Sequence, residues 1–288
     1  MQARVVTAHL ARHFGDPSAV VIAGTLAEAV QALERAEFSC VLLDLGLPDA
    51  DGLEAVKRIR LAAPDVAIVV LSGQENETIA LLAVREGAQD YIVKNTVKPD
   101  HIARSINHAI ERKHHESVLV HQALYDDLTG LANRTQLQSR LKIAVSRLRR
   151  HRETSAVLFL DLDGFKLIND QHGHAVGDTV LVVVARRLER MARSDDMVAR
   201  LGGDEFMVLC EDTDAEGAER LVRRIRGVLR DPIALADGTF VSVGTSIGVA
   251  LAQSGAATPE GLLKEADAAM YADKASRGAG RERIGAPN

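Results

Sequence analysis

The sequence contains few of the residues that mark disulfide-rich or metal-thiolate proteins. Its 288 residues include two cysteines and no tryptophan, and aromatic residues make up 3% of the chain. Two cysteines far apart in the sequence are too few for a framework of several disulfides. Cys40 and Cys210 both lie in apolar runs typical of strands. We therefore expect two buried, reduced thiols rather than a disulfide or a metal site.

Long apolar segments and an excess of positive charge are also missing. No segment is long and apolar enough to span a membrane, and we expect neither a signal peptide nor an internal repeat. The formal net charge is −5, and no basic stretch is interleaved with aromatic residues, which argues against nucleic-acid binding. The composition predicts a cytoplasmic protein without membrane or nucleic-acid partners. With 47% hydrophobic residues, the chain can bury two cores.

The most informative stretch spans residues 200–206 and reads Arg-Leu-Gly-Gly-Asp-Glu-Phe. Residues 198–201 and 206–210 have the pattern of short strands, so residues 202–205 are predicted to form a hairpin turn. Paired glycines allow the positive φ angles of a tight turn and leave room for a large ligand. Asp204 and Glu205 add two oxygen donors, the ligands that a phosphate-bound Mg²⁺ ion prefers. Taken alone, the motif is more often a solvated turn.

A second carboxylate pair follows the apolar run at residues 156–160. The run ends at Asp161-Leu162-Asp163-Gly164, and side chains alternate along a strand, so Asp161 and Asp163 share a face. Carboxylates at the end of a buried strand are costly unless they bind a cation or a donor. An Asp-Gly turn that only ends the strand is the alternative.

The residues after this strand suit a nucleotide. Lys166 can neutralise a triphosphate, and the amides at the start of the next helix can bind its oxygens. Asn169 and Asp178 can together recognise a guanine edge, because an amide matches its acceptors and a carboxylate matches the N1 and N2 donors.

Several ordered motifs of the C-terminal part together resemble the GGDEF family of diguanylate cyclases. They are residues 127–134, residues 161–166, Asn169-Asp170, Gly173-His174, Gly177-Asp178 and residues 202–206. The resemblance implies a mixed α/β sheet of the palm or nucleotide-cyclase type. It also implies an Mg²⁺-dependent enzyme that condenses two GTP molecules to cyclic di-GMP and pyrophosphate across a homodimer.

The resemblance assigns a role to each matching residue. Asp161, the backbone carbonyl of Leu162 and Asp204 would hold magnesium. Asp204 would also accept the proton of the attacking hydroxyl, with Glu205 at the second metal position. The remaining substrate contacts would come from Phe165 and Lys166 at the phosphates, Asn169, His174 and Asp178 at the nucleoside, and Lys274 at the terminal phosphates. Relatives that accept ATP lack the carboxylate at the position of Asp178, so its presence favours guanine. Which arginine assists Lys274, Arg277 or Arg281, stays open.

A further match concerns regulation. Arg193-Ser-Asp-Asp196 has the Arg-x-x-Asp pattern of the family's product-binding site, at the usual spacing before the hairpin. A guanidinium can bind a phosphate or a guanine face, and a carboxylate can accept hydrogen bonds from guanine. The resemblance therefore implies inhibition by cyclic di-GMP, with Arg224 of a partner domain as a possible contributor. An exposed charged loop is the alternative.

The N-terminal part has apolar, strand-like runs at residues 39–44, 67–72 and 90–94, separated by helical patterns. This alternation predicts a doubly wound parallel sheet with its site at the carboxyl ends of the strands. The runs end in Asp44, Ser72 and Lys94, and this set resembles the response-regulator receiver domain. The resemblance makes Asp44 the phosphoacceptor for a histidine kinase, with Ser72 and Lys94 as partners and Tyr91 as the rotating aromatic residue.

One departure from the receiver pattern is expected. Residues 2–14 read as the first helix and residues 19–23 as the next strand, so the first strand and its magnesium-binding acid pair are missing from this sequence. Such a strand would be central, so its absence should weaken the sheet and its phosphoryl chemistry. Either the true start lies further upstream or this receiver is degenerate, so phosphorylation of Asp44 stays open. Asp49 and Asp51 are interpreted as loop acids.

Residues 100–122 have the pattern of one long helix that links a regulatory domain, residues 1–114, to a catalytic domain, residues 115–288. The leading hypothesis is an active diguanylate cyclase controlled by the N-terminal domain. One alternative is a silent sensor that binds cyclic di-GMP at Arg193 and Asp196. The other is a signalling adaptor whose receiver dimerises with partners. The intact acids at positions 161, 204 and 205 favour the enzyme.

Overall fold

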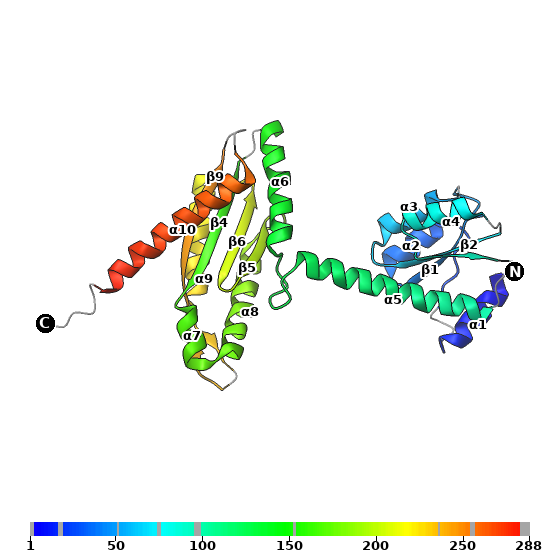
Figure 1. Cartoon of the computed structure of the whole chain (residues 1–288), viewed down its shortest axis with the longest axis horizontal. Helices are drawn as coiled ribbons and strands as arrows, with labels where there is room; N and C mark the ends of the chain where they lie inside the picture. Colours follow the sequence, from blue (N-terminus) through cyan, green and yellow to red (C-terminus); the bar gives the residue numbers. More distant parts are fainter. Residues whose placement is uncertain are drawn as a thin grey trace. The chain divides into compact units, whose positions relative to one another are not determined.

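A computed structural model describes residues 3–16, 20–50, 52–73, 76–94, 99–151, 154–235, 237–253 and 257–282. The chain divides into two compact units, residues 1–120 and 121–288 (Figure 1). Helix α5, Pro99–Leu124, begins in the first unit and ends in the second. None of the helices in the described residues combines the length and the apolar character needed to cross a membrane.

The N-terminal unit is built on a parallel sheet with strand order β1-β2-β3. Its strands are β1 (Cys40–Asp44), β2 (Ala67–Ser72) and β3 (Asp90–Val93). Its helices before α5 are α1 (Ala3–His13), α2 (Leu26–Arg35), α3 (Glu54–Ala62) and α4 (Glu77–Arg85). The register pairs Asp44 with Leu71 and Ser72 with Val93, so the carboxyl ends of the strands meet at one edge.

Helices cover both faces of this sheet. On one face, α2, α3 and α4 pack on the strands through a core that includes Leu26, Val56 and Ile59. On the other face, α1 and α5 contribute Leu10 and Ile106 to a second core. The predicted doubly wound parallel arrangement is therefore confirmed.

The strand predicted at residues 19–23 is wrong for the part that the structure describes. Residues 20–23 form no strand, and Val21 and Ile22 are 57% and 64% exposed. An apolar run becomes a strand only when it gains cross-strand partners and a face to bury. None of the described strands pairs with this segment.

The C-terminal unit contains a four-stranded antiparallel sheet with the order β5-β6-β4-β9. Its strands are β4 (Ser155–Asp163), β5 (Met197–Gly202), β6 (Glu205–Glu211) and β9 (Gly244–Ala252), and β7 (Ile233–Ala234) pairs with β8 (Phe240–Val241) in a small hairpin. Its helices after α5 are α6 (Arg134–His151), α7 (Phe165–His172), α8 (His174–Met191), α9 (Ala215–Leu229) and α10 (Pro259–Glu282).

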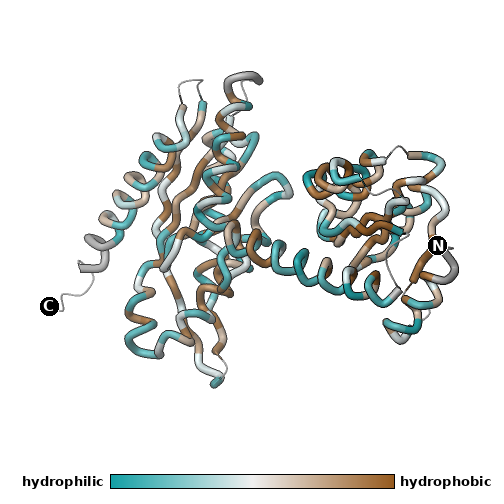
Figure 2. Tube along the Cα trace, turned by 45° about the vertical axis from the view of Figure 1, so that its right-hand side comes forward, coloured by the Kyte–Doolittle hydropathy of each residue, from teal (hydrophilic) through white to brown (hydrophobic). Residues whose placement is uncertain are grey.

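Side-chain alternation along β4 divides this unit into two cores. Leu158 and Leu160 face α7, α8 and α9, whereas Val157 and Phe159 face α6 and α10. The apolar residues follow the strands in the hydropathy colouring of Figure 2. At Gly248, α10 lies directly on β9, because an added Cβ would be 2.1 Å from the Ala266 carbonyl oxygen. This packing places the C-terminal half of α10 beside the end of β4.

Candidate functional site

The turn between β5 and β6 has the geometry that its two glycines permit. Gly202 and Gly203 have φ angles of 135° and 55°, which side chains with a Cβ rarely adopt. The strand register shifts between Arg200 and Gly202. Arg200 donates from Nε and Nη2 to the Gly203 carbonyl oxygen at 3.1 and 2.8 Å. The Arg200 side chain of β5 therefore holds the backbone of the turn.

The end of β4 lies beside this turn. Asp161 pairs with Glu205 across the sheet, and the Leu162 amide donates to the Asp204 carbonyl oxygen at 3.2 Å. Asp163 accepts a hydrogen bond from the Ser246 hydroxyl at 2.7 Å on the β9 side. The two carboxylate pairs identified in the sequence thus belong to one corner of the sheet.

Lys274 reaches this corner from α10. Its Nζ atom donates to Asp161 Oδ1 at 2.6 Å. The bond to Asp161 raises the pKa of the Lys274 ammonium group. The side chain of Lys274 is 46% exposed and that of Asp161 is 12% exposed. The contact therefore joins a solvent-accessible ammonium group to a carboxylate that is mostly enclosed.

Like charges accumulate around the turn. Burial raises the pKa of Asp204, and the nearby Asp161 carboxylate raises it further. Burial also raises the pKa of Glu205, opposed by the Arg134 guanidinium and reinforced by Asp161 and Asp204. Carboxylates with raised pKa values that share one corner are poised to take up a cation.

The donor set fits a magnesium ion bound together with phosphates. Two carboxylates and one backbone carbonyl are hard oxygen ligands, and Mg²⁺ completes its shell with water and phosphate oxygens. Among the described residues, no group of three or more His, Cys, Asp or Glu side chains is arranged as a metal site. The chain's own ligands at Asp161, Leu162 and Asp204 would therefore hold the ion only in part.

The predicted nucleoside residues lie on α7 and α8. Lys166, His174 and Asp178 are exposed. The Asn169 Oδ1 atom is buried and has no hydrogen-bond partner among the described residues. It lies against Gly177, where an added Cβ would be 1.9 Å away. A buried amide oxygen without a partner is a position that a ligand donor can satisfy.

Two predicted phosphate contacts are restricted by their surroundings. Phe165 is 8% exposed and belongs to the core under α7, which leaves its backbone amide as the group that can meet a phosphate. Arg277 donates from Nε to Asp273 Oδ2 at 3.1 Å. Asp273 also accepts from Arg226 Nη2 at 2.8 Å and from the Ile247 amide at 3.0 Å. The side chain of Arg281 lies outside the described residues.

The partner that fixes Arg200 was not predicted from the sequence. The guanidinium donates from Nη1 to both carboxylate oxygens of Asp126, at 2.9 and 3.0 Å. Asp126 Oδ1 also accepts from the Thr129 amide and hydroxyl at 2.9 and 2.6 Å. The signal was present one residue before the motif that begins at Asp127, as an acid three residues before a threonine.

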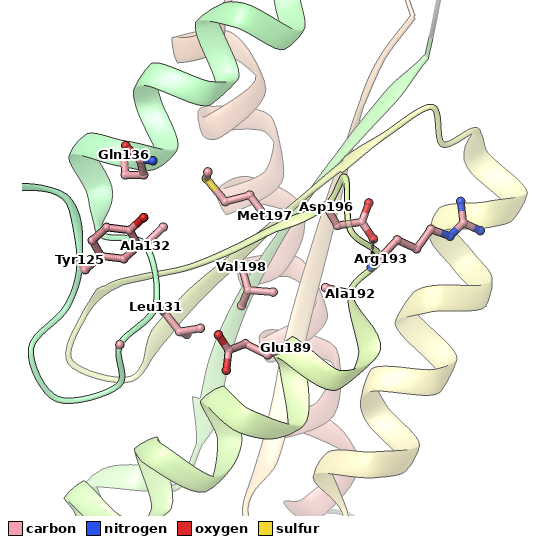
Figure 3. Close-up of a pocket in the computed structure, with 11 residues that line it drawn as sticks. Tyr125, Leu131, Ala132, Gln136, Glu189, Ala192, Arg193, Asp196, Met197 and Val198 are labelled. Atoms are coloured by element: carbon pink, nitrogen blue, oxygen red, sulfur yellow. Dashed lines mark hydrogen bonds between the residues drawn. The ribbon is translucent and has the colours of Figure 1, made fainter. Parts of the chain in front are cut away.

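The predicted product-binding residues lie in the loop between α8 and β5. Asp196 Oδ2 accepts from the Arg193 amide at 2.8 Å, and the Arg193 side chain is exposed. Both residues line a cavity of about 300 Å³ that also involves Tyr125 and Glu189 (Figure 3). Arg224 is exposed on α9. None of the acids at the turn lines this cavity, so it is separate from the carboxylate corner.

The predicted acid, hydroxyl and lysine of the N-terminal unit lie at the same edge of its sheet. Lys94 Nζ donates to Asp44 Oδ2, and the Lys94 amide donates to the Ser72 carbonyl oxygen at 2.8 Å. Burial acts to raise the pKa of Asp44, but the bonds from Lys94 and the Gly46 amide lower it.

One of the two acids predicted to lie in a loop contacts the start of α2. Asp49 accepts from the Leu26 and Ala27 amides at 2.8 and 3.0 Å and so caps α2, whereas Asp51 lies outside the described residues.

Both cysteines are free thiols, and burial raises the pKa of each to about 12.

Two paired carboxylates give the C-terminal unit a predictable response to acid. Burial acts to raise the pKa values of Asp126 and Asp273. It is outweighed by Thr129 and Arg200 at Asp126, and by the Ile247 amide and two arginines at Asp273. A folded-state pKa below the unfolded value of about 3.9 stabilises the fold at neutral pH, and this is lost as pH falls. The melting-temperature deficit of Asp126→Asn against wild type should therefore shrink between about pH 5 and pH 3. A deficit that stays constant would contradict this assignment.

Family models match both parts of the chain. Residues 123–280 match the model described as diguanylate cyclase, GGDEF domain, and residues 4–107 match the response regulator receiver domain. These matches agree with the two resemblances noted in the sequence.

Individual relatives show the same division. The diguanylate cyclase TpbB of Pseudomonas aeruginosa is 49% identical over 166 residues, which is 57% of this chain and 38% of that protein. The response regulator PleD of Caulobacter vibrioides is 32% identical over 247 residues, 82% of this chain and 54% of that protein. The chain thus spans about two fifths to one half of the length of these curated relatives.

A solved structure resembles the C-terminal part. The coiled coil and GGDEF domain of DgcB from Caulobacter crescentus, solved in complex with c-di-GMP, gives a TM-score of 0.57 at 27% identity. The likeness covers 62% of this chain and 94% of that one.

Proposed function

The chain belongs to the GGDEF family and carries a receiver domain before the GGDEF domain, and on this basis we propose that it is a diguanylate cyclase. It joins two GTP molecules to cyclic di-GMP through two phosphodiester bonds, with release of one pyrophosphate for each bond formed. The 3′-hydroxyl of one GTP attacks the α-phosphate of the other, and each of two subunits presents one GTP. Such phosphoryl transfer depends on positioning and charge neutralisation more than on covalent chemistry.

The observation that carries the proposal is the single corner formed by Asp161, Asp204, Glu205 and Lys274. The pairing of Asp161 with Glu205 and the bond between the Leu162 amide and the Asp204 carbonyl oxygen bring the two acid motifs together. Lys274 adds a cation at the same place. Clustered acids raise one another's pKa values, so the arrangement is understandable as a cation site rather than as a device for stability.

Within this site each residue has a separate task. Asp161, the Leu162 carbonyl and Asp204 would hold Mg²⁺, which would supply neutralisation of phosphate charge and polarisation of the reacting oxygens. Asp204 accepts the proton of the attacking hydroxyl, and Glu205 would support a second metal ion. Lys166 and Lys274 offset phosphate charge. Asn169 and Asp178 bind the guanine edge, and the unpartnered Asn169 Oδ1 supports the placement of a ligand donor there.

Regulation follows from the two remaining sites. Cyclic di-GMP binds at Arg193 and Asp196 and inhibits the enzyme, and the exposed Arg193 side chain beside a cavity supports this assignment.

The receiver domain controls the dimerisation of two GGDEF domains through α5. The input signal is phosphorylation of Asp44 by a histidine kinase. The ion pair between Asp44 and Lys94 supports this assignment.

The decisive experiment is incubation of the purified chain with GTP and Mg²⁺, followed by chromatographic detection of cyclic di-GMP. Product that forms with GTP and not with ATP supports the proposal. Binding of cyclic di-GMP without turnover at any protein concentration would instead favour the silent sensor.

Gly177 offers a test of the nucleoside pocket. A Cβ at this position would lie 1.9 Å from Asn169 Oδ1, so Gly177→Ala must displace the amide. Loss of one good hydrogen bond to the base should raise the KM for GTP about tenfold. Gly227→Ala on α9 is the matched control, because an added Cβ there meets nothing within 4 Å. Equal KM values in the two variants would remove Asn169 from the pocket.

A further inference from the structure

The ammonium group of Lys274 and a magnesium ion would share one ligand. Lys274 Nζ lies 2.6 Å from Asp161 Oδ1, the carboxylate that the proposed function assigns to the metal. At this distance the ammonium group donates directly to the oxygen and excludes a cation from the same lone pair. The Lys274 ammonium group therefore competes with the metal ion for the Asp161 carboxylate.

The surroundings of the pair make the competition effective. Asp161 is 12% exposed, so solvent screens its charge only weakly, and the Lys274 ammonium group also feels the charges of Asp204 and Asp163. Lys274 thus contacts one carboxylate and feels the charge of two more. Lys274 is itself 46% exposed at the end of a flexible side chain, so its ammonium group can leave Asp161 without moving α10.

A bound triphosphate would favour transfer of the Lys274 ammonium group from Asp161 to the phosphates. Its oxygens offer Lys274 a partner with more negative charge than one carboxylate, and they bring the metal ion with them. When the ammonium group moves to the phosphates, Asp161 becomes available to the ion. Nucleotide and metal then enter together.

We propose that Lys274 acts as a placeholder at Asp161, which keeps metal from binding alone and exchanges its carboxylate for the nucleotide's phosphates when both arrive. This inference rests on the proposed function, since it assumes the same metal ligand. It adds that the nucleotide-free protein has a low affinity for divalent cations, and that one lysine causes this.

The experiment is a titration of the nucleotide-free chain with Mn²⁺, a paramagnetic substitute for Mg²⁺, with free ion measured by electron paramagnetic resonance. Lys274→Met should bind Mn²⁺ at least about tenfold more tightly than wild type, because a direct contact between opposite charges is removed. Lys274→Arg retains the charge and the contact, so its affinity should stay near that of wild type.

Two controls separate occupancy of Asp161 from a general change in charge. Lys264→Met removes an exposed lysine from the same helix, and Arg134→Met removes a cation that acts on Glu205 through space. Both should bind Mn²⁺ within about twofold of wild type. Equal affinity in Lys274→Met and wild type would overturn the inference, and so would an equal gain in Arg134→Met. Circular dichroism shows whether each variant is folded.

Failure of the Mn²⁺ titration and failure of the catalytic test can be told apart. Wild-type protein that makes no cyclic di-GMP, with Mn²⁺ affinity still increased in Lys274→Met, would refute the cyclase and keep Lys274 as the group that blocks metal binding at Asp161. Active wild type with no gain in Lys274→Met would do the reverse.

Discussion

Asp204→Asn should lower the rate of cyclic di-GMP formation by about 10²–10⁴-fold at saturating GTP and Mg²⁺. The carboxylate is assigned two tasks, as a metal ligand and as the acceptor of the hydroxyl proton. An amide is a weaker, uncharged ligand and cannot accept the proton. The backbone of the turn should be unaffected, because its contacts to Leu162 and Arg200 use the Asp204 and Gly203 carbonyl oxygens. The loss should therefore appear in kcat, with the fold intact.

The same substitution should stabilise the protein at neutral pH. Burial and the Asp161 charge raise the pKa of Asp204, so its ionised form destabilises the folded state above that pKa. This cost is relieved as pH falls through the raised value, or at any pH when the charge is removed. Thermal unfolding at pH 7 should show a higher midpoint for Asp204→Asn than for wild type.

Asp231→Asn is the control, because it removes the same charge from an exposed side chain of the same unit. It should change neither turnover nor the melting temperature appreciably. Product formation by Asp204→Asn at more than about one tenth of the wild-type rate would refute the role of this carboxylate. An inactive and less stable Asp204→Asn would mean that the acid is part of the fold rather than of the chemistry.

The sequence predicted most of the elements that carry the site. Continuous apolar runs located β4 and β6, and the glycine pair located the turn between β5 and β6. The pairing of Asp161 with Glu205 was not predictable, because register depends on contacts between strands that are far apart in the chain. The resemblance to a known family placed the acids together; periodicity alone did not.

Long-range partners account for what the sequence did not predict. The ring of Phe165 packs in the core, so only its backbone amide is left for a ligand. A sequence motif does not show whether the ring or the amide of a residue contacts the ligand. Asp273 binds arginines from α9 and α10, and nothing in the local sequence connects Arg226 to it. The strand expected at residues 19–23 failed for a similar reason, since its apolar residues found no partner strand among those described. Local pattern specifies an element, whereas pairing decides its use.

Arg200 shows how such a partner can control the site from outside it. The guanidinium is 11% exposed, and it binds both oxygens of Asp126 while donating twice to the Gly203 carbonyl oxygen. Asp126 is held in turn by Thr129, just after α5 ends. The planar fork of one arginine therefore joins the segment after α5 to the turn that carries Asp204.

Arg200→Met should destabilise the C-terminal unit by about 3–5 kcal/mol, because it leaves the Asp126 carboxylate without its cation in a site that is 21% exposed. It should also lower kcat by about 10²-fold, since the Gly203 carbonyl loses both donors and the turn can shift. Arg200→Lys keeps the charge but cannot serve Asp126 and Gly203 together, so most of the stability should return and less of the activity.

Urea unfolding and initial rates of product formation measure the two effects separately. Arg147→Met is the matched control, because Arg147 also contacts a carboxylate, Glu211, at 2.7 Å but is 46% exposed and shares that partner with Arg140. It should cost less than about 1 kcal/mol and leave turnover unchanged. A double-mutant cycle with Asp126→Asn should give a coupling energy above about 1 kcal/mol. If Arg200→Lys recovers stability and full activity alike, the fork geometry is irrelevant and charge alone positions the turn.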